Sequence, residues 1–136
     1  MQVLADTSAL LALSRPQDQY HARAVRIAER HVAAGGRYLS TMLILGEFYS
    51  HLLYLRGPAG ARNALTHLLD DPIHEWVDVT AELVREAKTR WLMRFTDQRF
   101  SLVDAVSFEI MRRERLTHAF AFDHHFVVAG FTLVKA

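Results

Sequence analysis

Apolar residues first gather in Val3–Ala5, a short continuous run that ends at an acidic residue, Asp6. An apolar run of this length is typical of a strand buried on both faces of a parallel sheet. Two hydroxyl residues follow Asp6 and precede a helix-forming stretch that extends to about Leu13. The pattern therefore predicts that Asp6 lies where a strand ends and a helix begins, at the carboxyl edge of a sheet.

The remaining chain alternates between helical and strand-like patterns. Apolar residues at helical spacing predict helices at about 17–34, 42–55, 59–69, 81–95 and 102–115, with a short turn or helix at 124–129. Strand-like runs occur at 37–40, 75–79, 118–122 and 131–134. Strands that alternate with helices indicate an α/β fold whose parallel sheet is covered on both faces. We find no repeat or linker, so we expect residues 1–136 to form one domain.

Composition narrows the possible chemistry. The chain has no cysteine, which excludes disulfides, thiolate nucleophiles and cysteine-based zinc sites. No apolar run reaches the roughly 20 residues that span a bilayer, and no basic segment precedes the first apolar run as it does in a signal peptide. We therefore expect a cytoplasmic protein without a membrane partner. The net charge of +1 does not itself predict nucleic-acid binding, which would depend on local patches of arginine.

Four carboxylates occupy positions that the predicted topology brings to one edge of the sheet. Asp6 and Asp123 follow predicted strands, whereas Glu47 and Asp104 lie near the starts of predicted helices. Right-handed crossovers place both kinds of position at the carboxyl edge, where open α/β sheets bind ligands. Two carboxylates about 4 Å apart repel by roughly 4 kcal/mol at an effective dielectric of about 20, so a cluster destabilises the fold unless it is protonated or bridged by cations. Oxygen ligands favour Mg²⁺ or Mn²⁺, which activate water against a phosphodiester.

Each acid also has a purely structural interpretation. Asp6 and Asp123 can cap the helices that follow them, and Asp104 can complete a capping box with Ser101. Glu47 lies in an almost entirely apolar helix, so its carboxylate needs a partner or a pocket. Taken singly, Asp104 and Asp123 are better explained as caps. The convergence of all four favours a functional site.

Other polar residues are candidates for lesser roles. Asp97 lies in a polar loop near the cluster and can support it. Arg15 and Arg99 flank loops expected at the active edge and are candidate phosphate contacts. The pair His124-His125 follows the last acid, but the chain has eight histidines and we interpret this pair as surface or packing residues. Arg112-Arg113 ends a helix, where cations complement the helix dipole.

Four segments, L-A-D-T-S-A-L at 4–10, L-G-E-F-Y at 45–49, the stretch 97–108 and F-D-H-H-F at 122–126, follow one another along the chain. In this order they resemble the PIN-domain nucleases, and most of all the VapC-type toxins of bacterial toxin–antitoxin pairs. The resemblance implies a three-layer α/β/α fold around a mostly parallel five-stranded sheet, and a Mg²⁺- or Mn²⁺-dependent endoribonuclease. It implies a catalytic metal pocket formed by Asp6, Glu47, Asp104 and Asp123 and supported by the hydroxyls of Thr7, Ser8 and Ser101.

The same resemblance implies partners: an RNA substrate, a cognate antitoxin and a second copy of the chain in a homodimer. The apolar helix around Phe48 is first of all core, and its additional aromatic residue Tyr54 suits a dimer face or a groove for an antitoxin segment. The alternative hypothesis is a catalytically silent PIN fold that binds RNA or a partner. The complete set of four acids argues against that alternative, because a silent module does not require them.

Overall fold

The computed structural model describes residues 1–136 and has a five-stranded sheet at its centre. The strands are β1 (Gln2–Ala5), β2 (Arg37–Thr41), β3 (His74–Val77), β4 (His118–Phe120) and β5 (Thr132–Leu133). Their spatial order is β3-β2-β1-β4-β5, and every pairing between neighbours is parallel. The prediction of a five-stranded, mostly parallel sheet is therefore confirmed.

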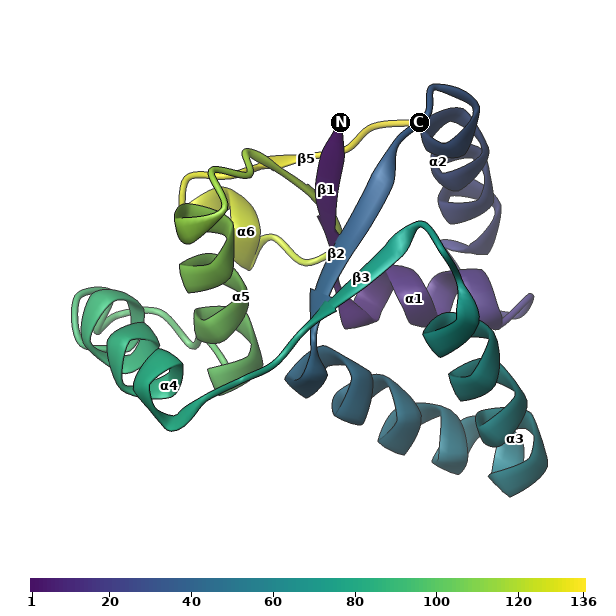
Figure 1. Ribbon diagram of the computed structural model, residues 1–136, viewed down its shortest axis with the longest axis horizontal. Helices are drawn as coiled ribbons and strands as arrows, with labels where there is room; N and C mark the ends of the chain where they lie inside the picture. The colour runs from purple at the N-terminus through teal and green to yellow at the C-terminus, as the bar shows by residue number, and fades with distance from the viewer.

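Helices cover the sheet in two groups (Figure 1). The group on one side consists of α1 (Thr7–Ser14), α2 (His21–Ala33) and α3 (Met42–Asp70). The other consists of α4 (Ala81–Ala87), the π-helical turn η1 (Lys88–Leu92), α5 (Leu102–Arg113) and α6 (His125–Val128). The three-layer arrangement matches the sequence prediction. None of these helices combines the length and apolar character that crossing a membrane would require.

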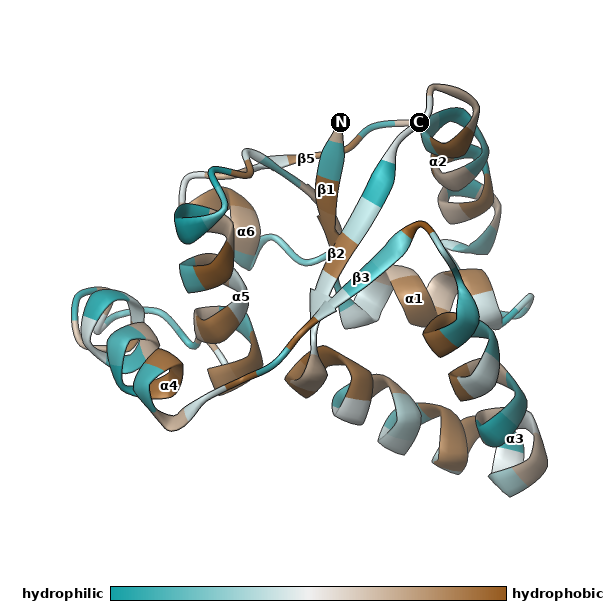
Figure 2. Cartoon of the chain, in the orientation of Figure 1, coloured by the Kyte–Doolittle hydropathy of each residue, from teal (hydrophilic) through white to brown (hydrophobic).

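Strand β1 is the centre of the core, because β2 pairs with it on one side and β4 on the other. Its residues Val3, Leu4 and Ala5 are no more than 1% exposed, and β1 is brown over its later part in Figure 2. The backbone N–H of Asp6 donates to the carbonyl of Phe120 at 3.0 Å. The end of β1 is thereby held by a neighbouring strand, which fixes where the Asp6 side chain begins.

Helix α2 begins at His21 and not, as predicted, at Gln17. The carboxylate of Asp18 accepts the backbone N–H of Tyr20 at 2.8 Å, which closes a turn where the helix was expected. The ring of His21 then bonds to the carbonyl of Ala12 at 2.7 Å. These two contacts, neither of which a pattern of apolar residues reveals, hold the loop between α1 and α2 in place.

The helix predicted over 81–95 is also wrong in its second half. Helix α4 gives way to the wider turn η1, in which the N–H of Met93 donates to the carbonyl of Lys88 at 3.0 Å. In this turn Trp91 reaches the core and its indole N–H donates to the carboxylate of Glu109 at 3.2 Å. The change from α-helical to π-helical winding is thus accompanied by a buried hydrogen bond between Trp91 and Glu109.

The predicted break between two helices in α3 is confirmed at Gly57, which has φ 79° and ψ 175°. This left-handed φ favours glycine, and Pro58 then starts the second helix, where a missing N–H costs nothing. The last three strands are shorter than predicted, because the chain leaves the sheet at 78–79, 121–122 and 134 to enter the loops of the carboxyl edge.

Candidate active site

A cavity of about 290 Å³ at the carboxyl edge collects all four predicted acids and all three predicted hydroxyl residues. The residues that line it are Asp6, Thr7, Ser8, Leu11, Glu47, His51, Ser101, Asp104 and Asp123. They come from the segments that follow β1 and β4, from α1, from the second and third turns of α3, and from the start of α5. The topology therefore brings together side chains that are more than a hundred residues apart in sequence.

Asp6 both caps α1 and faces the cavity. Its Oδ2 accepts the hydroxyl of Ser8 at 2.9 Å and, at 3.4 Å, the backbone N–H of the same residue. Burial raises the pKa of Asp6 to about 7; the hydrogen bond from Ser8 opposes this shift and the nearby carboxylate of Asp104 adds to it. Asp6 therefore caps α1 and also lines the cavity, and its role as a metal ligand stays a prediction.

Asp104 forms the predicted capping box with Ser101. The backbone N–H of Asp104 donates to the Ser101 hydroxyl, and the N–H of Ser101 donates to Oδ2 of Asp104, both at 3.0 Å. This reciprocal pair orients a carboxylate that is itself buried at the start of α5. As with Asp6, the local cap positions the acid at the cavity wall.

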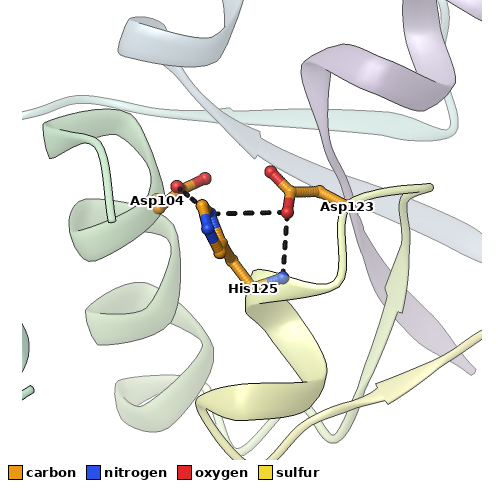
Figure 3. A group of neighbouring side chains, drawn as sticks. All are labelled: Asp104, Asp123 and His125. Atoms are coloured by element: carbon orange, nitrogen blue, oxygen red, sulfur yellow. Dashed lines mark hydrogen bonds and ion pairs between the residues drawn. The ribbon is translucent and has the colours of Figure 1, made fainter. Parts of the chain in front are cut away.

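His125 lies between two of the acids (Figure 3). Its Nδ1 is 3.1 Å from Oδ2 of Asp104 and 3.4 Å from Oδ1 of Asp123, and its backbone N–H donates to the same Asp123 oxygen at 2.9 Å. Potential metal-ligating atoms of the three residues all lie within 4.8 Å of one another. The ring of His125 also packs against Phe100 with centroids 5.3 Å apart, in line with the packing interpretation, and His124 is exposed. The contacts of His125 with the two acids were not predicted. The missed signal is the spacing D-x-H at the start of a short helix.

Glu47 and His51 reach the cavity from α3, one helical turn apart. Glu47 is half-buried. The Nδ1 of His51 lies 2.9 Å from the carbonyl of Glu47, and because a carbonyl only accepts, this nitrogen donates and Nε2 remains available to a ligand. Sequence reasoning missed His51, although its i+4 spacing from an acid on one helix face was a usable signal.

Three weaker candidates lie outside the cavity. Asp97 is exposed, and its side chain contacts only the neighbouring amide of Gln98, at 3.5 Å. Arg99 is exposed on the same loop, and Arg15 is half-buried beyond the end of α1. None of the three lines the wall that contains the acids.

A further buried acid, Glu109, lies in α5 but outside this cavity. Its side chain is fully buried and forms ion pairs with Arg90 at 3.1 Å, Arg112 at 2.8 Å and Arg113 at 3.2 Å. Burial tends to raise the pKa of Glu109, but hydrogen bonds from Arg112, Arg113 and Trp91 outweigh that effect and lower it. Arg112 and Arg113 thus neutralise a specific carboxylate in addition to ending a helix, and Glu109 has a structural role.

The cavity suits a hard divalent cation. The hydrogen bonds that orient its carboxylates use Oδ2 of Asp6, Oδ2 of Asp104 and Oδ1 of Asp123, so the second oxygen of each is available to a ligand. The Oγ1 of Thr7 is buried in the wall and has no hydrogen-bond partner. Carboxylate and hydroxyl oxygens are the ligands of Mg²⁺ and Mn²⁺, and a cation would stabilise the ionised Asp6, whose pKa is raised mainly by burial and further by Asp104.

A family model described as the PIN domain matches residues 3–131. The chain belongs to the PIN-domain family. The 23S rRNA-specific endonuclease VapC20 of Mycobacterium tuberculosis is 32% identical over 133 residues, which cover 98% of each chain, and the same match occurs in two strains. PIN domains are metal-dependent nucleases. The predicted family and class of enzyme, a PIN-domain nuclease of the VapC type, are therefore confirmed.

Solved structures agree with this assignment. The crystal structure of Mycobacterium tuberculosis VapC20, a toxin that cleaves the sarcin–ricin loop, superposes with a TM-score of 0.88 at 30% identity and covers 98% of this chain and 99% of that one. VapBC2 from Rickettsia felis, bound to a promoter DNA fragment, has a TM-score of 0.72. FitAcB from Neisseria gonorrhoeae superposes with a TM-score of 0.68. Both of these are 13% identical over at least 97% of each chain and show the shared fold alone.

Proposed function

We propose that this PIN-domain protein is the toxin of a type II toxin–antitoxin pair and hydrolyses a phosphodiester bond in a loop of 23S ribosomal RNA. The observation that carries the proposal is the convergence of Asp6, Glu47, Asp104 and Asp123 on one cavity. A related endonuclease of nearly the same length acts on 23S rRNA, which supports the choice of substrate. In this proposal the whole chain is one catalytic domain.

The four acids would hold Mg²⁺ or Mn²⁺. When bound, such an ion neutralises the carboxylates, orients the scissile phosphate and lowers the pKa of water. The carboxylates do not bind phosphate by themselves, because both groups are negatively charged and repel each other. Cation binding therefore has to precede or accompany RNA binding at this cavity.

The remaining cavity residues position the acids and the substrate. Ser8 holds Asp6 through a hydroxyl that donates to Oδ2, and Ser101 holds Asp104 through the capping box. The unpartnered hydroxyl of Thr7 can donate to a phosphate oxygen or a water in the cavity. Nδ1 of His51 is occupied by the Glu47 carbonyl, so Nε2 is the ring nitrogen that can hydrogen-bond the substrate from α3.

Two protein partners belong to the same proposal. A cognate antitoxin would block the cavity by offering a basic side chain to the acids. A second copy of the chain would cover α3, where Leu53, Tyr54 and Leu55 are 39%, 90% and 41% exposed. Consecutive exposed apolar residues of this size are typical of an interaction surface.

RNA cleavage by the purified, antitoxin-free protein tests the proposal. Wild type and Asp6→Asn are incubated with ribosomes and with a labelled sarcin–ricin stem-loop, in Mn²⁺, in Mg²⁺ and in EDTA. We expect one defined cut that requires the metal and is absent in Asp6→Asn. Cleavage in EDTA, or unchanged turnover in Asp6→Asn, would contradict the assignment of the site. Cleavage of mixed RNA without a preferred loop would contradict the proposed substrate.

A further inference from the structure

Two hollows continue the acidic cavity along the carboxyl edge of the sheet. The first has a volume of about 500 Å³ and shares Ser8, Leu11 and Asp123 with the acidic cavity. The second has a volume of about 380 Å³ and shares Tyr20 and Phe122 with the first. Because neighbouring hollows share wall residues, the three adjoin one another in one depressed stretch of the surface. We call the two outer hollows together the Tyr20–Phe122 groove.

The charge of the wall changes along this depression. Acids line its inner end, whereas Arg23 from α2 and Lys135 from the segment after β5 line its outer end. Figure 1 shows that segment running from β5 toward α2. Arg15 and Arg99, the cations expected from the sequence to contact phosphate, line none of the three hollows. A strand that leaves the acidic cavity by this route passes Asp18 and Asp123 in the middle hollow and then reaches Arg23 and Lys135, the first arginine or lysine residues on its way.

An aromatic pair forms the middle of the groove. The half-buried rings of Tyr20 and Phe122 stack with centroids 4.5 Å apart and planes 5° from parallel. The guanidinium carbon of Arg23 is 5.5 Å from the first centroid and 5.9 Å from the second. Nearly equal distances place the cation beside the stacked pair and not on its outer faces. The groove thus presents a flat aromatic platform with a cation at its edge.

Hydrogen bonds connect this platform to the acidic cavity. The backbone N–H of Phe122 donates to the hydroxyl of Ser8 at 3.0 Å, and that hydroxyl donates to Asp6 at 2.9 Å. On the other side, the Asp18 carboxylate holds the backbone N–H of Tyr20 at 2.8 Å. Both rings therefore sit on backbone that is fixed relative to the carboxylates, which an enzyme needs if a neighbouring nucleotide is to align the scissile bond.

We infer that the Tyr20–Phe122 groove binds an unpaired nucleotide next to the scissile bond of the RNA substrate, an inference that rests on the proposed function. The base packs against Tyr20 and Phe122, and the adjoining phosphate contacts Arg23 and Lys135. Proteins hold unpaired nucleotides by this combination, an aromatic face for the base and a cation for the backbone. The platform favours a nucleotide over a peptide, since every base has a planar face and most side chains do not.

Substitutions in the groove test the inference. Tyr20→Leu removes the aromatic face but keeps apolar bulk, Tyr20→Phe keeps the face, and Arg23→Gln removes the cation. Arg26→Gln is the matched control, because Arg26 is exposed on the same helix and lines none of the hollows. The Michaelis constant and the turnover number are measured with the sarcin–ricin stem-loop. The dissociation constant is measured in excess Mg²⁺ with each substitution combined with Asp6→Asn, a variant expected not to cut the RNA.

We expect Tyr20→Leu and Arg23→Gln to raise the Michaelis constant about tenfold with turnover within about twofold of wild type, as expected for loss of one stacked base or one phosphate contact. Arg26→Gln leaves both constants unchanged, and Tyr20→Phe, which keeps the aromatic face, has a Michaelis constant lower than that of Tyr20→Leu. In Arg23→Gln, the slope of log binding constant against log salt falls in magnitude by about 0.7, the value for one phosphate contact on a single strand.

The other outcomes separate this inference from the proposed function. If wild type is active and the Michaelis constants of Tyr20→Leu and Arg23→Gln are unchanged, the nucleotide-binding role of the groove is refuted and the proposed nuclease activity is not. If wild type binds the stem-loop without cutting it and both variants weaken binding, the groove is supported and the proposed activity fails. Absence of both cleavage and binding overturns both. Loss of antitoxin binding with RNA constants unchanged assigns the groove to a protein partner and overturns the inference.

Discussion

Replacing Asp6 by asparagine is expected to abolish RNA cleavage and at the same time to stabilise the metal-free protein. The carboxylate belongs to the acidic cavity and has a pKa of about 7 in place of the usual 3.8, chiefly because it is buried and also because Asp104 is near. Asparagine keeps an oxygen that can accept the Ser8 hydroxyl but carries no charge. It therefore removes the cost of ionising a buried acid while it retains the cap of α1.

The size of the effect depends on pH. Below about pH 4 the Asp6 carboxyl is protonated in both the folded and the unfolded protein, and the raised pKa costs no stability. Between pH 4 and 7 the unfolded chain releases the proton first, so the free energy of unfolding falls as pH rises, and above pH 7 the loss levels off. A shift of about three pKa units corresponds to about 4 kcal/mol in total. From pH 5 to pH 8 we expect wild type to lose about 2.5 kcal/mol more than Asp6→Asn.

Urea unfolding in EDTA at pH 5 and pH 8 measures this difference. Asp78→Asn is the control, because Asp78 is exposed on the loop between β3 and α4 and forms no hydrogen bond through its carboxylate. Mg²⁺ added at pH 8 should stabilise wild type by about 2.7 kcal/mol at a hundred times its dissociation constant, and Asp6→Asn by much less. Equal loss of stability by wild type and Asp6→Asn between pH 5 and 8 would refute the reasoning, and so would a destabilised Asp6→Asn at pH 8.

Three further predictions concern the supports of the site and the partner surface. Ser8→Ala leaves the N–H of Phe122 and the carboxylate of Asp6 without their shared hydroxyl, so the free energy of unfolding in urea should fall by about 1–3 kcal/mol and metal affinity, measured by calorimetry, should weaken. Unaltered stability and affinity would show that the hydroxyl is dispensable. Glu109→Gln should cost about 1.5–3 kcal/mol in the same assay, because it removes the carboxylate that pairs with Arg90 and Arg112, while Arg113 keeps its pair with Glu82. Cleavage by the folded fraction should stay at the wild-type rate, and lost cleavage would place Glu109 in the reaction. Tyr54→Lys should shift the protein from dimer to monomer in light scattering, since it charges a 90% exposed apolar position, and a dimer that persists would exclude this face.

Most of the fold follows from local patterns that have a single physical explanation. The apolar run before Asp6, the capping box of Ser101 and Asp104, and the glycine break at Gly57 each specify a boundary within a few residues. The start of α2 was missed because it depends on the carboxylate of Asp18, whose preference for a turn competes with a helical apolar pattern. The π-helical turn was missed because its cause, the burial of Trp91 against Glu109, is a tertiary contact.

In the candidate site, too, some residues could be predicted from the sequence and others depend on tertiary contacts. Its acids were predictable because topology alone sends strand ends and helix starts to one edge. His125 and His51 were not selected, because each meets the acids only through the orientation of its own turn: His125 folds back onto Asp123, and His51 lies one turn beyond Glu47. The Tyr20–Phe122 stack joins a loop near the start of the chain to the end of β4, a pairing over 102 positions that no local pattern encodes.

The position of β1 between β2 and β4 has a consequence for synthesis of the protein. Chains emerge from the ribosome with the N-terminal part first, so Asp6 and Glu47 appear early while one edge of β1 still lacks its neighbour. That neighbour, β4, arrives with Asp123 immediately behind it, and the hydroxyl of Ser8 can accept the N–H of Phe122 only at that point. Assembly of the acidic cavity is thus delayed until nearly all of the chain has been made. While the chain is still attached to the ribosome, its acidic residues are therefore present but not yet assembled into a site that could cleave RNA.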